Sequence, residues 1–479
     1  MKKLITLFLA AAMLTALALP MTACSGSRRL LRMEESERAV AFYTMTDRNM
    51  NYARSGSFEQ TMVLDATMNG VAYKQTTEAT VTFISERDDV TYLEQAKTTV
   101  DMAGGGTVIH SDSGYTDGMM FSYTKEGRYE TKLKSAVSVE EYSAFRQFQN
   151  QKAPLIQVGE GFCETMSCQQ KEDGTWEATY EGFTEEGMTP FLFMLRGVDY
   201  MVTAEHSLTD VRLTLTADKK LYPTSMKMEF VFEKNPASTA PLPVVTMENE
   251  YHGWNNTVLS DPYDLSDFTE VDDLRAIEAF SDALLERSTA QSGAFKVDVT
   301  TTANGGGYND TVTNHQKVTF DGTDGYRFTY DYDKDGYDYK LSYAEGELTV
   351  KIYENGKKVH SEVQDMSDAQ ARGTVVQLMD PENLTASGIS DVRITNTEQG
   401  ICRFTLSEAF KNSYKEQYEA SGMTMTDFSG YCEATLPEGV LTKCRYHMEI
   451  AVQVNGQTVW TVVDMTITFM ELQQSGEAV

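Results

Sequence analysis

The sequence is poor in positive charge and in the patterns that most often carry catalysis. Its 479 residues include 41 Lys and Arg against 71 Asp and Glu, which gives a formal net charge of −30. Nucleic acids bind basic surfaces that neutralise phosphates, so this composition disfavours a nucleic-acid partner. The six histidines are scattered, and the sequence contains no Walker loop, nucleophile elbow or zinc-protease motif. We therefore expect neither an enzyme nor a cofactor.

Long apolar runs are missing after the first twenty residues, and no later stretch is apolar enough to cross a bilayer. At the start, two lysines precede an apolar run over 4–19, the pattern of a secretory signal. The run is followed by Met-Thr-Ala-Cys at 21–24, which resembles the lipobox of bacterial lipoproteins, with methionine where leucine is usual. The resemblance implies that Cys24 is lipidated and forms the mature N-terminus. The alternative is an ordinary cleaved signal beside a stray cysteine.

Export and lipidation would place the protein on the extracytoplasmic face of the membrane, in the cell envelope. Its first partner would then be the membrane itself, reached through the N-terminal lipid. We expect residues 24–33 to form a short tether whose arginines lie against anionic headgroups.

Cysteines other than Cys24 are few, and their number is odd, so at least one thiol is unpaired within the chain. Cys432 and Cys444 flank Leu-Pro-Glu-Gly at 436–439, where a tight turn would set them opposite each other. A disulfide and two reduced core thiols both fit this pattern.

An internal repeat organises the chain. Ser-Gly-Ser-Phe at 55–58 recurs as Ser-Gly-Ala-Phe at 292–295, and Val-Thr-Phe at 81–83 recurs at 318–320 with the same spacing. A repeat this long indicates a duplicated globular domain, because solenoid units are far shorter. The polar, turn-rich stretch around 255–262 separates the two copies. We expect few contacts across it and independent folding of each half.

Apolar and polar residues alternate after the start of each copy, which is typical of half-buried strands. We expect helices at the start of each copy and over 139–151, 185–196, 367–379 and 407–420. The predicted fold is α+β, with two tandem, mostly antiparallel, curved sheets (half-barrels), each packed on a few helices. The residues expected on the inner faces are Phe58, Met62 and Leu64 in copy one, and Phe295, Val297 and Val299 in copy two.

These elements resemble the LolA-like lipoprotein-carrier superfamily, which includes the mycobacterial LprG and LppX lipoproteins. The similarity rests on the lipobox, the opening helix, the Ser-Gly-x-Phe entry into long strands and a Tyr-x-x-Gly hairpin at 115–118 and 343–346. It implies a curved sheet around helices with an apolar cavity that holds acyl chains. The implied organisation is a signal peptide (1–23), a tether (24–33), a first domain (34–258), a linker (259–264), a second domain (265–472) and a tail (473–479).

The predicted function is a non-catalytic surface lipoprotein that binds lipid or another apolar ligand in a cavity between sheet and helices. The alternative is a structural or sensory module that works through contacts with a membrane or envelope protein and holds no ligand. Asp331, Asp333 and Asp335 match the start of a calcium loop, although serine stands where its bidentate glutamate belongs. A charged hairpin is the other reading of this segment, and we expect no metal.

Overall fold

The computed structural model describes residues 24–473 with several gaps. The residues outside the described part are 1–23, 69–70, 87–88, 103–104, 149–165, 183–205, 235–240, 259–262, 289, 291, 323–324, 335, 367, 381, 383, 385, 455 and 474–479. The predicted signal peptide and the predicted helix over 185–196 therefore lie outside it.

The first curved sheet is antiparallel apart from one short added strand, and its order is β12-β6-β5-β4-β3-β2-β1-β11-β10-β9-β8-β7. Its opening strand pairs on both sides, with the next strand and with the last long strand of the copy. The strands are β1 (Ser55–Met68), β2 (Val71–Glu86), β3 (Asp89–Met102), β4 (Gly105–Thr116), β5 (Met119–Glu126), β6 (Tyr129–Ala136), β7 (Ser167–Gln170), β8 (Trp176–Gly182), β9 (His206–Ala217), β10 (Pro223–Lys234), β11 (Val244–His252) and β12 (Thr269–Glu270).

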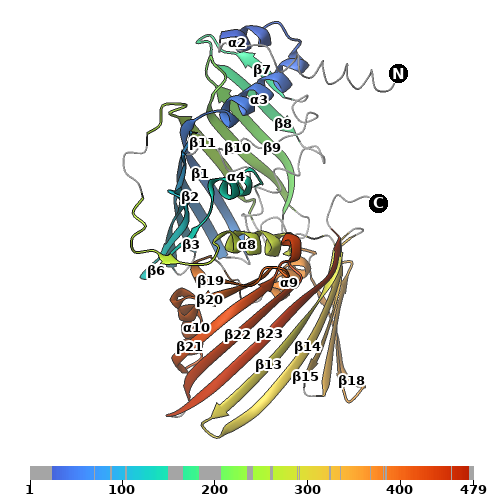
Figure 1. The fold of residues 1–479 in the computed structure, drawn as a ribbon. Helices are drawn as coiled ribbons and strands as arrows, with labels where there is room; N and C mark the ends of the chain where they lie inside the picture. Colours follow the sequence, from blue (N-terminus) through green and yellow to red (C-terminus); the bar gives the residue numbers. More distant parts are fainter. Residues whose placement is uncertain are drawn as a thin grey trace, which may run out of the picture.

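The second curved sheet repeats this arrangement in the order β18-β17-β16-β15-β14-β13-β23-β22-β21-β20-β19. Its opening strand again lies between the next strand and the last strand of the copy, so the two halves have the same topology (Figure 1). The strands are β13 (Ser292–Gly305), β14 (Tyr308–Asp321), β15 (Arg327–Lys334), β16 (Tyr337–Ala344), β17 (Glu347–Glu354), β18 (Lys357–Asp365), β19 (Ile389–Asn396), β20 (Ile401–Leu406), β21 (Thr424–Thr435), β22 (Lys443–Val454) and β23 (Gln457–Gln473).

Helices interrupt the strands at the predicted places. Three of the four helices predicted between strands are confirmed, at α4, α9 and α10, and together with the two curved sheets they confirm the predicted fold class. The helices are α2 (Cys24–Leu30), α3 (Glu35–Asn51), α4 (Val139–Phe148), α8 (Arg275–Ser288), α9 (Asp368–Met379) and α10 (Glu408–Ala420), with 3-10 turns η1 (Ala386–Gly388) and η2 (Pro437–Gly439). Among the described residues, none of the helices is long and apolar enough to span a membrane.

Each half buries an aromatic pair between its opening helix and its sheet. Phe42 of α3 faces Trp176 of β8, with ring centroids 6.4 Å apart. Phe280 of α8 packs on Phe404 of β20 at 5.1 Å. All four rings are completely shielded from solvent, so these contacts bring most of the apolar area of each ring into the core.

The residues predicted to be a tether are folded against the body. Trp176 donates its indole N–H to the Ser27 hydroxyl over 2.7 Å, and Leu30 is fully buried. Arg38 of α3 donates to the carbonyl oxygen of Leu30 over 3.1 Å. Helix α2 is thus held by hydrogen bonds and by burial, and it begins at Cys24, whose side chain lies outside the described part.

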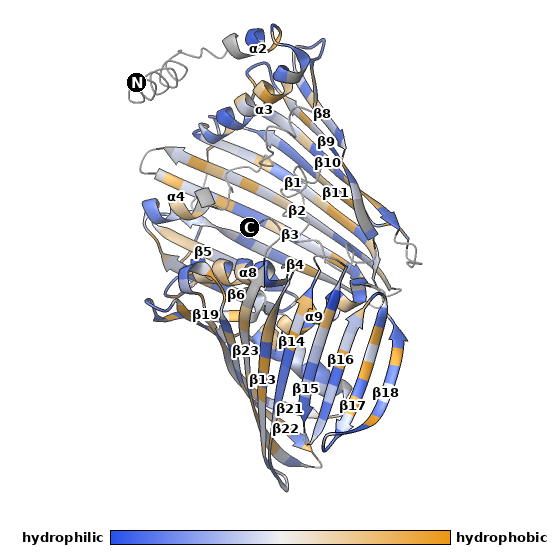
Figure 2. Cartoon of the chain, turned by 90° about the vertical axis from the view of Figure 1, so that its right-hand side faces the viewer, coloured by the Kyte–Doolittle hydropathy of each residue, from blue (hydrophilic) through white to orange (hydrophobic). Residues whose placement is uncertain are grey.

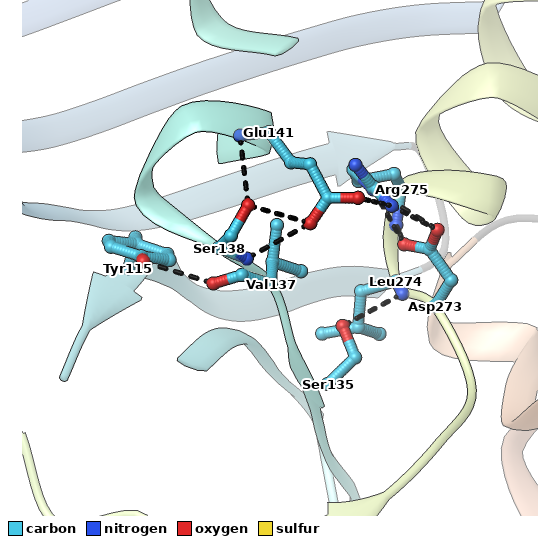
Figure 3. Close-up of polar contacts among 8 residues, drawn as sticks. All are labelled: Tyr115, Ser135, Val137, Ser138, Glu141, Asp273, Leu274 and Arg275. Atoms are coloured by element: carbon cyan, nitrogen blue, oxygen red, sulfur yellow. Dashed lines mark hydrogen bonds and ion pairs between the residues drawn. The ribbon is translucent and has the colours of Figure 1, made fainter. Parts of the chain in front are cut away.

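The expectation of few contacts between the halves is wrong. Strand β12 pairs in parallel with β6 of the first sheet, although its residues belong to the predicted second domain. Leu274 donates its backbone N–H to the Ser135 hydroxyl on β6 (Figure 3). Asp272 donates its N–H to the Val392 carbonyl, and its carboxylate accepts the N–H of Ile394 on β19. The connecting segment therefore satisfies backbone groups on one edge of each sheet, which would otherwise be left unpaired.

Candidate ligand-binding face

In the first sheet, the three residues predicted to line a cavity lie on one face, as their spacing requires. Phe58 and Leu64 are buried in the core, and Met62 is partly buried. The ring of Phe58 packs on that of Tyr251 on β11, with centroids 5.7 Å apart. The described residues around β1 thus form a packed core at Phe58 and Leu64, with Met62 at its margin.

In the second sheet, Phe295 and Val297 are buried, while Val299 is only partly buried. Phe295 lies against Phe469 of β23, with ring centroids 6.2 Å apart. Exposure therefore increases along the inner face of β13, from the end near helix α8 towards the far end of the strand.

The neighbouring strands repeat this gradient. Phe320, Phe328, Tyr343 and Leu348 form one row across β14–β17, and all four are buried. Helix α9 covers this row, because Tyr343 donates to the Asp368 carboxylate and Arg372 lies 5.0 Å above the Tyr326 ring. The next two rows of residues on the same face of β15, β16 and β17 are only partly buried.

These two rows form an apolar, tyrosine-rich surface that we call the open strip. The paired registers place its six residues side by side on β15, β16 and β17, and each is only partly buried. Tyr332 packs on Tyr330 and Tyr339, with centroid distances of 6.1 Å and 5.5 Å. Burial raises the pKa of Tyr330 to about 12, so its hydroxyl stays neutral at physiological pH. The members are Tyr330, Tyr332, Tyr339, Leu341, Val350 and Ile352.

A hydrogen-bond acceptor without a partner lies on the same face. Asn314 of β14 pairs in register with Val299 of β13, next to the open strip. Its side-chain oxygen is buried, yet no hydrogen bond to it occurs within the described part of the chain. Buried polar atoms are usually satisfied, so this oxygen marks a place where a donor from outside the chain would be stabilised.

The same strands carry an open, charged groove of about 520 Å³, most of whose lining residues belong to the opposite face, while Gln316, Tyr332 and Tyr339 belong to the face of the open strip. His315 and Asp298 are joined there by a contact of 2.6 Å between Nδ1 and Oδ1. The lining residues are Lys296, Asp298, His315, Gln316, Lys317, Asp331, Tyr332, Asp333, Asp338, Tyr339 and Lys340.

The segment that partly matches a calcium loop lines part of this groove. Asp331 and Asp333 belong to β15, and the segment's flanks are the two strands of a hairpin, as the second reading predicted. Asp335 lies outside the described residues. In the part of the chain that is described, no group of three His, Cys, Asp or Glu side chains could hold a metal ion.

The thiols of Cys432 and Cys444 are close together, although the two residues are diagonal neighbours on β21 and β22 instead of directly opposite. Their sulfur atoms are 3.3 Å apart, and both residues are buried. Burial and the neighbouring thiol raise the pKa of Cys432. In the structure both are thiols, and their sulfur separation is longer than a disulfide bond.

The tyrosines of the open strip were not predicted as site residues. Their period-two spacing is visible in the sequence as Phe-x-Tyr-x-Tyr at 328–332 and Tyr-x-Tyr-x-Leu at 337–341. The aspartates between these tyrosines match the start of a calcium loop. They lie on the opposite face of the strands, as the register of β15 with β16 shows.

The sequence matches no known family model, and no curated protein is significantly similar to it. Matches to solved structures are weak. A DUF1329 family protein from Desulfovibrio piger is 13% identical with a TM-score of 0.16, and covers 43% of this chain and 95% of its own. A transferrin-binding protein B mutant from Haemophilus parasuis is 6% identical with a TM-score of 0.14, and covers 88% and 77%. TM-scores this low carry no argument about fold or function.

Proposed function

We propose that this chain is an exported, non-catalytic surface lipoprotein that binds a lipid or another apolar molecule on the inner face of its second sheet. The open strip carries the proposal, because its three tyrosines and three aliphatic side chains are only partly covered, beside a row of the same face that is buried. Ligand sites are mostly apolar surfaces with a few placed polar groups. The likeness of the strand pattern to the LolA-like carriers supports the same class of ligand.

The ligand would combine an apolar body with a hydrogen-bond donor. Asn314 offers its buried side-chain oxygen beside Val299, and the tyrosines of the open strip offer flat surfaces for an acyl chain or ring. A hydroxyl, an amide or a protonated carboxyl group would satisfy that oxygen. A fully ionised carboxylate would not, since it has no proton to donate.

Anchoring at Cys24 would also orient the molecule. Helix α2 is docked on the end of the first sheet that lies far from the second sheet (Figure 1). Arg28 and Arg29 in its last turn are exposed and would meet anionic headgroups. The second sheet, with the open strip, would then project away from the membrane.

A protein-contact module without a ligand is the second candidate. It is supported by Phe58, Leu64, Phe295 and Val297, which fill the positions where a cavity was expected and are at most 3% exposed. If the first half is packed throughout, it would act as a spacer between the membrane and the second half.

The ligand proposal is tested by lipid uptake. We would measure native mass spectra for co-purified lipid and titrate the full chain with a fluorescent fatty acid. Val299→Glu places a charge on the inner face and is expected to weaken uptake about tenfold or more, because an unpaired carboxylate is poorly tolerated there. Thr300→Glu, one residue along on the outward face of β13, is the matched control and should bind like the parent. A parent protein without lipid or fatty-acid binding would favour the protein-contact module.

The anchor is tested separately by Cys24→Ser. A diacylated cysteine holds a protein firmly on a bilayer, whereas a single chain binds only marginally. The variant should be released from the membrane or accumulate as an uncleaved precursor. Unchanged processing and membrane retention would contradict the lipoprotein assignment.

A further inference from the structure

The charged groove of the second sheet is lined by two rows of side chains with opposite net charge. It lies on β13, β14, β15 and β16, which are neighbours in the sheet (Figures 1 and 2). The paired registers place three lysines and one aspartate in the first row, in the order Lys296, Lys317, Asp331 and Lys340. They place three aspartates and one histidine in the second row, in the order Asp298, His315, Asp333 and Asp338. On each strand the two rows are two residues apart, a distance of about 7 Å.

Lys296 and Lys317 form the positive end of the groove. They lie directly opposite each other on β13 and β14, and both are exposed. Asp331 faces Lys317 from β15, yet neither lysine forms an ion pair within the described part of the chain. Lys340, at the other end of the row, lies 5.7 Å from the centre of the Tyr353 ring. Like charges opposite each other repel, so an anion bound between Lys296 and Lys317 would offset an unfavourable pair.

Asp333 and Asp338 form the negative end of the groove. They lie directly opposite each other on β15 and β16, next to the turn that joins these strands. Asp298 is contacted by His315 over 2.6 Å, whereas the carboxylates of Asp333 and Asp338 have no ion-pair or hydrogen-bond partner among the described residues. A cation bound between these two carboxylates would therefore offset a second unfavourable pair.

The distance between the two ends sets the size of a ligand that could reach both. They are two strand spacings apart across the sheet and two residues apart along it, which leaves about 12 Å between the midpoints of the two backbone pairs. The flexible lysine side chains shorten this gap, so charges about 7–10 Å apart on a ligand would meet both ends. An extended tripeptide has its amino and carboxyl groups about 10 Å apart, because each residue adds about 3.3–3.6 Å. The groove of about 520 Å³ lies within the size range of small-molecule sites.

We propose that the charged groove is a second binding site, separate from the open strip, and that it takes a short peptide with free amino and carboxyl ends. The peptide carboxylate would lie between Lys296 and Lys317, and its ammonium group between Asp333 and Asp338. A polyanion would meet the row of aspartates, and a polycation would meet the lysines. A molecule with one charge of each sign is therefore the better match.

A saturation-transfer NMR titration of the full chain with triglycine tests the class of ligand. The titration is made in a non-ionic detergent at low salt, where exposed charges are little screened. N-acetyl-triglycine lacks the ammonium group, triglycinamide lacks the carboxylate, and glycine carries its two charges too close together. Each is expected to bind roughly fivefold more weakly than triglycine. A parent that does not bind triglycine would overturn the proposal, and so would equal binding of triglycine and either blocked peptide.

Charge-removing variants test the position of each end. Lys296→Gln/Lys317→Gln should bind triglycine no better than the parent binds triglycinamide. Asp333→Asn/Asp338→Asn should bind it no better than the parent binds N-acetyl-triglycine. Lys351→Gln is the matched control, because Lys351 continues the lysine row on β17 outside the groove, and it should bind like the parent. Unchanged binding by both double variants, or equal weakening by the control, would contradict the site. Fatty-acid uptake should be the same in all three variants, so a failure here is distinguishable from a failure of the open strip.

Discussion

Leu274 donates its backbone N–H to the hydroxyl of Ser135 over 3.0 Å, and both residues are shielded from solvent at the junction of the two halves. Figure 3 shows this contact beside the capping residues of α4. Ser135→Ala would leave a buried N–H without a partner, and we expect the free energy of unfolding to fall by about 1–3 kcal/mol. Urea unfolding followed by circular dichroism measures it. Ser429→Ala, at an exposed serine on β21, is the control. Equal stability of both variants would show that water replaces the lost hydroxyl.

The ionised carboxylate of Glu141, at the same junction, should make the stability of the fold depend on pH. The Ser138 hydroxyl and backbone N–H both donate to its carboxylate, and the Ser138 hydroxyl accepts the N–H of Glu141 in return, which caps α4. These hydrogen bonds, followed by the charge of Arg275, lower the pKa of Glu141 below its usual 4.5. Its stabilising contribution is therefore fully present above about pH 4.5 and is lost as the pH falls through the lowered pKa.

Glu141→Gln tests this dependence, because the amide keeps the shape of the side chain without the charge. Melting temperatures of the parent and the variant should differ above pH 5 and converge as the pH approaches 3. Two curves that stay parallel over this range would mean that Glu141 does not contribute through its charge.

Gly114 permits close packing between β3 and β4. A Cβ atom at this position would collide with the carbonyl oxygen of Tyr92 and lie 2.9 Å from the ring of Phe121. The colliding atom belongs to the backbone and cannot rotate away, so Gly114→Ala should destabilise the fold by about 1–3 kcal/mol. Ser113→Ala on the same strand is the control. A thermal melt of Gly114→Ala that matches this control would contradict the collision.

The buried cysteines should be inert in the folded protein. Burial raises the pKa of Cys168 to about 12 and that of Cys402 to about 11, so little thiolate exists at neutral pH. We expect iodoacetamide to label neither in the native state and both after unfolding, as read by peptide mass spectrometry. Cys432 and Cys444 should also become labelled after unfolding if they are thiols. If they react only after a reductant is added, they form a disulfide.

Several elements could be predicted because they depend on local sequence. The helix predicted over 407–420 is found as α10, and Ser407 caps it by accepting the Phe410 N–H. The inward direction of Phe58 and Phe295 follows from the two-residue period of a strand, which needs no knowledge of distant residues. The repeat in turn predicted two halves of the same kind, and the two sheets have the same strand order apart from the added β12.

The degree to which each face is covered could not be predicted in this way. Val297 and Val299 are equally apolar and lie on the same face of one strand, yet only Val297 is buried. The difference depends on where other elements of the fold end, and the alternation of β13 contains no information about that. The same limit applies to the open strip: Tyr343 is buried and bonded to Asp368 of α9, whereas Leu341 and Tyr339, on the same face of the same strand, are only partly buried.

The sequence by itself determined which residues form strands and which face each side chain takes, because both follow from the local backbone and its two-residue period. Only the tertiary structure decided which strand edges are used. Leu133 and Lys134 of β6 pair with Thr269 and Glu270 of the connecting segment, whereas Lys357–Asp365 pairs on one side only among the described residues. Edge pairing joins segments that are distant in the chain, and its hydrogen bonds come from backbone groups that every residue carries. Composition and spacing therefore cannot distinguish an edge that is covered from one that remains open.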